Sequence, residues 1–317
     1  STDSVVIIDQ RRSDYVIIVG SSADETERFS AGELQNYLEQ MTGARLPIQI
    51  DPEPAPIHFI SIGQTQLAAD AHFSVRLRHR FDDGFVIRND QGNLMIRGAC
   101  SRGTLFAVYA LLEKWGCRWF APDFAHYQGN HELVPQCDTI AFEEKVWIER
   151  PEFELRGSFI EIFVSDEPWR DIQAIIAWLA KVRKNYLGMD QHPLFDFREV
   201  YPGHRSVWFK EGLWEAVLET NAERDLTLAI GGHGFFTFLP PKVYFEQHPE
   251  WYALVDGERI DHGQICVSNK EAGAAYVSRY MDFVRAHPEI DIFCVMPNDG
   301  LKWCQCESCQ ALGSVLN

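Results

Sequence analysis

The sequence predicts an α/β protein with an N-terminal α/β sandwich domain, followed by the first half of a TIM-like (β/α)8 barrel. Two observations lead to this fold class. Residues 1–148 combine short β-branched runs with two amphipathic helices, whereas residues 149–317 repeat a strand–helix order. Repeated β-α units imply a parallel sheet, and four such units make half of an eight-stranded barrel. We place the boundary at Glu149-Arg150-Pro151.

The N-terminal domain is expected to be a small sheet with two helices on it. A helix over Thr26–Thr42 follows several N-cap candidates and ends at Gly43, and a second over Gly103–Trp115 ends at Gly116. Strands are predicted at residues 5–8, 15–19 and 57–62, and a hairpin at residues 83–98 turns at Gln91-Gly92.

The second domain is expected to supply four strand–helix units. The strands are predicted at residues 153–161, 186–189, 226–231 and 290–297, and the helices at residues 171–184, 207–224 and 270–286. The segment 235–269 is too long for a plain connection, which indicates a functional role. Because an open apolar sheet edge favours aggregation, we expect the chain to be a fragment of a longer protein.

Composition and charge exclude several classes of function. A formal net charge of −17 disfavours nucleic-acid binding and docking onto an anionic membrane. No run of 18 apolar residues is present, so no membrane insertion is expected. We expect a periplasmic, secreted or cell-surface protein whose signal has been removed, and the oligomeric state stays open.

The strand ends supply the candidate site residues. In a parallel barrel the reacting groups lie at the C-terminal ends of the strands. This rule selects carboxylates, histidines and an amide at four predicted strand ends: Glu161, Asp190, His192, His233, Asn298 and Asp299.

Three cysteines crowd one short segment as Cys304, Cys306 and Cys309. With Cys266 as a fourth ligand they predict a structural zinc site that joins the long excursion to the fourth strand. One disulfide with spare thiols, or three cysteines with His262, are the alternatives. No cofactor is expected for catalysis.

Three stretches carry a family resemblance. Residues 31–47 (AGELQNYLEQMTGARLP) and 97–122 (RGACSRGTLFAVYALLEKWGCRWFAP) resemble the non-catalytic α/β domain of β-hexosaminidases and α-glucuronidases. Residues 248–257 (HPEWYALVDG), 264–269 (QICVSN), 297–300 (PNDG) and 303–309 (WCQCESC) together resemble a bacterial barrel domain. That domain, formerly of unknown function, includes endo-β-N-acetylglucosaminidases of glycoside hydrolase family 163.

The resemblance implies a retaining, substrate-assisted hydrolase of glycans that contain N-acetylglucosamine. Asp299 would be the general acid, and Asn298 would orient or polarise the acetamido group. This Asn-Asp pair departs from the Asp-Glu pair of β-hexosaminidases, and a plain turn completed by Gly300 is the alternative. An α-glucuronidase-like hydrolase and a non-catalytic glycan-binding protein are the competing functions.

Further substrate contacts follow from the same resemblance. Arg156 is similar to an arginine that grips sugar hydroxyls, although a structural ion pair would also satisfy it. His233, in Gly231-Gly232-His233, is similar to a strand-three histidine of the same enzymes. Glu161 and Asp190 lie at strand ends, and Trp251 and Trp303 are candidates for stacking on sugars, with a place in the core as the alternative for each Trp.

Overall fold

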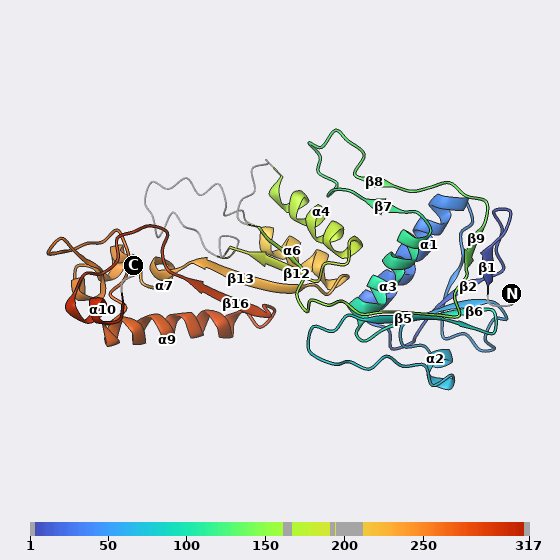
Figure 1. Cartoon of the computed structure of the whole chain (residues 1–317), viewed down its shortest axis with the longest axis horizontal. Coiled ribbons are helices and arrows are strands. Elements are labelled where there is room, and N and C mark those ends of the chain that lie inside the picture. The colour runs from blue at the N-terminus through green and yellow to red at the C-terminus, as the bar shows by residue number, and fades with distance from the viewer. Residues whose placement is uncertain (1–3, 161–166, 191–193, 195–211, 314–317) are drawn as a thin grey trace. The chain divides into compact units, whose positions relative to one another are not determined.

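The computed structural model describes residues 4–160, 167–190, 194 and 212–313 (Figure 1). These residues form two compact units. Unit 1 holds residues 4–157, 167–186 and 215–226, and unit 2 holds the described residues of 158–166, 187–214 and 227–317. The chain therefore leaves unit 1 after Gly157 and returns to it for two helical segments.

Unit 1 is built on a six-stranded mixed sheet with the order β10-β5-β6-β4-β2-β3. The pairs β2–β3, β2–β4 and β4–β6 are parallel, and β5 pairs antiparallel with both β6 and β10. The strands are β2 (Val16–Val19), β3 (Ile48–Ile50), β4 (Phe59–Ile62), β5 (Phe85–Asp90), β6 (Asn93–Gly98) and β10 (Val146–Glu149).

Helices α1 (Glu25–Thr42) and α3 (Ser101–Lys114) lie side by side on one face of this sheet (Figure 1). The α1 helix begins where the Asp24 side chain accepts a hydrogen bond from the Glu27 backbone N–H. It ends at Gly43, whose φ of 81° is a left-handed conformation that favours glycine. The short helix α2 (Gln66–Asp70) lies on the opposite face.

Smaller elements complete unit 1. Strand β1 (Val5–Ile8) pairs with β9 (Ile140–Phe142), and β7 (Arg118–Trp119) pairs with β8 (Glu132–Leu133). Helix α4 (Pro168–Lys181) packs on α3, and most of α6 (Leu213–Ala222) also belongs to this unit.

Unit 2 is built on a four-stranded sheet with the order β11-β12-β13-β16. The pair β13–β16 is parallel, with His233 opposite Met296. The strands are β11 (Gly157–Ile160), β12 (Tyr186–Met189), β13 (Thr227–His233) and β16 (Ile292–Met296). The α/β fold class is confirmed, and the described residues contain these four barrel-type strands without a closed barrel.

The excursion between β13 and β16 is folded rather than irregular. It contains α7 (Phe235–Phe238), α8 (Pro241–Tyr244), a 3-10 turn at Pro249–Trp251, the hairpin β14 (Leu254–Val255) with β15 (Glu258–Arg259), and α9 (Lys270–Ala286). An aromatic core of Phe236, Phe238, Trp251, Tyr252 and Tyr276 holds these pieces together. Helix α10 (Glu307–Ala311) follows β16. None of the helices in the described ranges has both the length and the apolar character needed to cross a membrane.

Candidate functional site

The ends of three neighbouring strands of unit 2 bring the predicted residues to one edge of the sheet. Asp190 directly follows β12, His233 is the last residue of β13, and Asn298 and Asp299 follow β16. Because β12, β13 and β16 are consecutive in the sheet, these side chains come from adjacent positions along that edge. Glu161 and His192 lie outside the described residues.

Two glycines let the strand ends approach closely. A Cβ at Gly231 would lie 2.2 Å from the Cys294 carbonyl oxygen, and a Cβ at Gly232 would lie 2.3 Å from a carboxylate oxygen of Asp190. Both distances are far inside van der Waals contact, so neither position accepts a side chain without movement. The Asp190 carboxylate, which is buried, thus sits against the backbone just before His233.

The imidazole of His233 is held by the neighbouring strand end. Its Nδ1 lies 2.6 Å from the carbonyl oxygen of Pro297. A carbonyl oxygen only accepts, so Nδ1 carries the proton and Nε2 is the acceptor of the neutral ring. His233 thus lies at the end of β13, and its role in substrate binding stays a prediction.

Asn298 is buried, and its side-chain amide is hydrogen-bonded to other residues of the chain. Its Oδ1 accepts from the Phe236 backbone N–H at 3.2 Å, and its Nδ2 donates to the Gly263 carbonyl at 2.8 Å. The Gln264 side chain completes the anchor, because it accepts from the Asn298 backbone N–H at 3.0 Å and donates to its carbonyl at 2.5 Å. These bonds hold the loop after β16 in place.

Asp299, the next residue, is exposed. The anchored neighbour therefore fixes the backbone from which this carboxylate projects. Gln264 is a residue that sequence reasoning missed. Gln264 lies in the stretch 264–269, which carries part of the family resemblance. Its neighbours in the sequence do not indicate that its side chain is fully buried and hydrogen-bonds to a loop 34 residues away.

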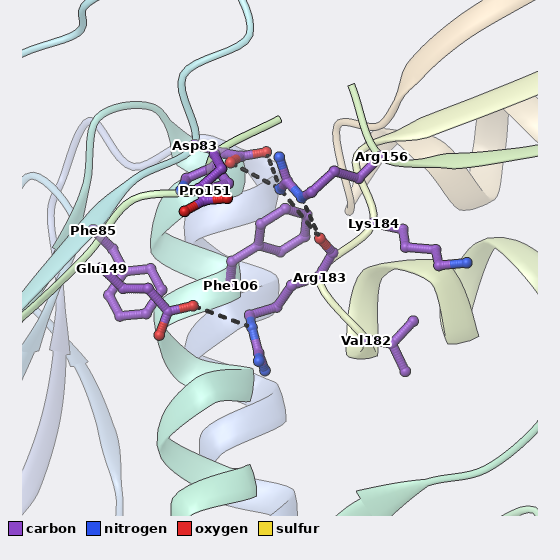
Figure 2. Close-up of a pocket in the computed structure, with 10 residues that line it drawn as sticks. Asp83, Phe85, Phe106, Glu149, Pro151, Arg156, Val182, Arg183 and Lys184 are labelled. Carbon is purple, nitrogen blue, oxygen red and sulfur yellow. Dashed lines mark hydrogen bonds and ion pairs between the residues drawn. The ribbon is translucent and has the colours of Figure 1, made fainter. Parts of the chain in front are cut away.

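Arg156 precedes β11 and so lies at the opposite end of that strand from the carboxyl end. One guanidinium nitrogen, Nη2, lies 2.9 and 2.8 Å from the two carboxylate oxygens of Asp83 (Figure 2). Another, Nη1, donates to the Phe153 carbonyl. Arg156 thus makes the structural ion pair that the sequence left open as the alternative. We do not place it in the site.

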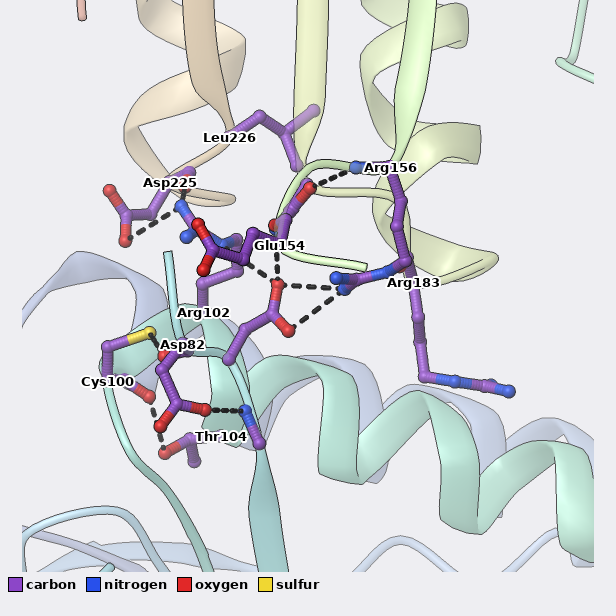
Figure 3. A network of polar contacts seen from close by, with 12 residues as sticks. Asp82, Cys100, Arg102, Thr104, Glu154, Arg156, Arg183, Asp225 and Leu226 are labelled. Carbon is purple, nitrogen blue, oxygen red and sulfur yellow. Dashed lines mark hydrogen bonds and ion pairs between the residues drawn. The ribbon is translucent and has the colours of Figure 1, made fainter. Parts of the chain in front are cut away.

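A pocket of about 350 Å³ lies beside this ion pair in unit 1 (Figure 2). The charged side chains that line it largely form ion pairs within unit 1, since Arg183 pairs with both Glu149 and Glu113. Figure 3 shows the adjoining network, in which Arg102 pairs with Asp225 and Arg156 reaches the same buried cluster. The cluster therefore serves packing within unit 1.

The two tryptophan candidates differ in exposure. Trp251 is 8% exposed, belongs to the aromatic core, and stacks on His248 with ring centroids 4.1 Å apart. This burial places Trp251 in the core, the alternative left open for it, and leaves its ring no room to stack on a sugar. Trp303 is half-buried in the loop after β16, and its stacking role stays a prediction.

The four cysteines of the predicted metal site meet in unit 2. The sulfur atoms of Cys266, Cys304, Cys306 and Cys309 all lie within 4.8 Å of one another. The Ser268 hydroxyl lies 3.5 Å from the Cys306 sulfur, and this hydrogen bond is the largest of several that together lower the pKa of the Cys306 thiol to about 6.

The chain shares its fold with several solved glycoside hydrolases. A chitobiase of Flavobacterium johnsoniae superposes with a TM-score of 0.55 at 13% identity, over 97% of this chain and 45% of that one. A β-N-acetylhexosaminidase of Bacteroides fragilis gives 0.53 at 10% identity, over 98% and 57%. A 4-O-methyl-α-glucuronidase with specificity for decorated arabinogalactans gives 0.51 at 16% identity, over 91% and 41%.

The chain spans roughly half the length of these structures. At such identities the likeness establishes the fold alone. No curated protein matches the chain significantly. A family model described as "Domain of unknown function (DUF4838)" matches residues 126–315. Because that match covers more than half of the 317 residues, the chain belongs to this family of domains of unknown function.

Proposed function

We propose that the protein is a glycoside hydrolase that acts on glycans containing N-acetylglucosamine. One observation carries the proposal: Asp190, His233 and Asp299 come from adjacent strand ends at one edge of a barrel-type sheet. In barrel enzymes this edge is where the reacting groups lie. The shared fold with β-N-acetylhexosaminidases supports the same class of substrate.

In the proposed mechanism Asp299 is the general acid. Its exposed carboxylic acid would protonate the glycosidic oxygen as the bond to the leaving sugar breaks. The acetamido oxygen of the substrate would attack the anomeric carbon, so the configuration would be retained after water opens the cyclic intermediate. His233 would bind a sugar hydroxyl, and the buried Asp190 would support the backbone just before it.

Asn298 takes a different role from the one expected from the sequence. Both polar atoms of its amide already bond to Phe236 and Gly263, so we assign it to positioning Asp299 rather than to contact with the acetamido group. The group that orients the acetamide is then a different one.

An α-glucuronidase-like activity has less support. A uronate needs cations beside the sugar, whereas the strand ends described here present Asp190 and Asp299. Arg156, the arginine expected to grip sugar hydroxyls, is paired with Asp83. The negative charge of these carboxylates therefore favours a neutral sugar over a uronate.

The test compares Asp299→Asn with wild type in the full-length protein. On an N-glycan, whose leaving group needs protonation, we expect kcat/KM to fall by about 10²- to 10⁴-fold. On a dinitrophenyl N-acetyl-β-glucosaminide, whose leaving group needs no acid, the loss should be much smaller. Asp282→Asn, at an exposed carboxylate on α9, is the matched control and should match wild type.

Two results would contradict the proposal. Equal rates for Asp299→Asn and wild type on both substrates would remove the acid assignment. Binding of the N-glycan without hydrolysis by wild type would favour the non-catalytic alternative.

A substrate with an N-trifluoroacetyl group tests assistance by the acetamido oxygen separately, because its weaker carbonyl nucleophile should slow the first step.

A further inference from the structure

We propose that Cys266, Cys304, Cys306 and Cys309 bind one Zn²⁺ ion in a tetrahedral, purely structural site. The inference does not depend on the proposed glycosidase activity, because it rests on the cysteine cluster alone. All four residues belong to unit 2, and their sulfur atoms lie within 4.8 Å of one another.

The spacing of the sulfur atoms fits a zinc tetrahedron. With zinc–sulfur bonds of about 2.3 Å, two ligands of a tetrahedral site lie about 3.8 Å apart. The Cys266 sulfur lies 3.7 Å from the sulfur of Cys306 and 3.7 Å from that of Cys309. One thiol is thus equally close to two others, an arrangement that suits a shared central ion better than one paired bond.

The ligand set is complete and closed. Zinc sites with four protein ligands are structural, whereas catalytic sites keep one position for water or substrate. Three of the cysteines are buried, and Cys306 is half-buried. The variant with His262 is not supported, because that side chain is exposed and its Nδ1 contacts Asp261 at 2.8 Å.

The surroundings suit the negative charge of such a site. Four thiolates around Zn²⁺ carry a net charge of −2, which nearby donors must offset. The Leu254 backbone N–H donates to the Cys304 sulfur at 3.3 Å, and the Arg259 guanidinium lies 3.7 Å from the same sulfur. Arg259 is oriented by its bond to the Tyr252 carbonyl at 2.6 Å. Such outer partners are the rule around metal ligands.

The ion would join segments that are far apart in the sequence. Cys266 lies two residues after Gln264, which anchors the loop after β16, and the other three cysteines lie further along that loop and in α10. Hairpin β14–β15 covers the cluster through Leu254 and Arg259. The zinc would therefore tie the loop that carries Asn298 and Asp299 to the long excursion.

The experiment measures metal in protein purified without added zinc. Elemental analysis should find about one zinc per chain in wild type, and less than a tenth of that in a double variant with Cys306→Ser and Cys309→Ser. Cys294→Ser is the matched control: its cysteine lies in the same unit, in β16, outside the cluster, so zinc should be retained.

A second measurement separates metal loss from misfolding. Wild type stripped with a chelator under reducing conditions should take up one equivalent of Co²⁺, with the intense visible bands of tetrahedral cobalt–thiolate coordination. Zinc below a tenth of an equivalent in wild type, together with no cobalt uptake, would overturn the proposal. So would a disulfide among these four cysteines in freshly purified protein, or full zinc retention in the double variant.

Discussion

Replacing Asp83 with alanine tests how strongly the buried ion pairs hold unit 1 together. The Asp83 side chain is 1% exposed and accepts hydrogen bonds from Arg156 and from the Asn185 amide at 2.8 Å. The Arg102 guanidinium, 6% exposed, lies 3.6 Å from the same carboxylate. Removal of this carboxylate takes away the negative charge that the guanidinium groups of Arg156 and Arg102 share.

The expected loss of stability follows from that geometry. Breaking a buried pair by removing one partner costs about 3–5 kcal/mol, because the remaining charge stays out of water. Arg102 keeps its contact with Asp225, so the value should fall toward the lower end of that range. An exposed pair is worth about 0–1 kcal/mol. Asp138→Ala, which breaks the exposed pair between Arg11 and Asp138, is therefore the matched control.

Hydrogen exchange at the amides of α3 reports on unit 1 alone, since that helix is almost wholly buried there. A loss of about 3–5 kcal/mol should lower the protection of these amides roughly 10²- to 10⁴-fold in Asp83→Ala. The control should change it less than tenfold. If both variants changed protection equally, the buried pairs would contribute no more than surface ones, and the reasoning would fail.

Two further predictions concern single side chains. Burial, together with the Asp24 carboxylate, raises the pKa of Glu27 from 4.5 to about 7, so the folded state keeps a proton that the unfolded state has released. Stability should therefore fall by up to about 3 kcal/mol as pH rises from 4.5 to 7, and Glu27→Gln should abolish that slope in urea titrations. Gly232→Ala should displace Asp190 and lower the melting temperature, whereas Gly273→Ala, with open space at its Cβ in α9, should raise it slightly. Equal melting temperatures for the two alanine variants would contradict the close approach at Gly232.

Much of the local structure could be predicted because its signals are local. Helix α9 spans the expected residues 270–286, since Asn269 caps its first turn by accepting from two backbone N–H groups. Strand β12 and the strand-end placement of His233 also match the predicted pattern. The strands β3, β7, β8, β9, β10, β14 and β15 were not predicted; most of them are runs of two or three residues, which carry too little periodicity.

The sequence by itself determined the α/β class, the repeated strand–helix order, and the spacing that brings cysteines together on one loop. Only the tertiary structure decided which polar groups are already used. From its residue type alone, Arg156 could bind either a sugar or an ion-pair partner. In the folded structure it pairs with the carboxylate of Asp83, 73 residues away. In the same way both polar atoms of the Asn298 side chain are hydrogen-bonded, to Gly263 and to Phe236. The residue type fixes which hydrogen bonds and charges a side chain can offer. Whether these are available to a ligand depends on partners that only long-range packing brings within bonding distance.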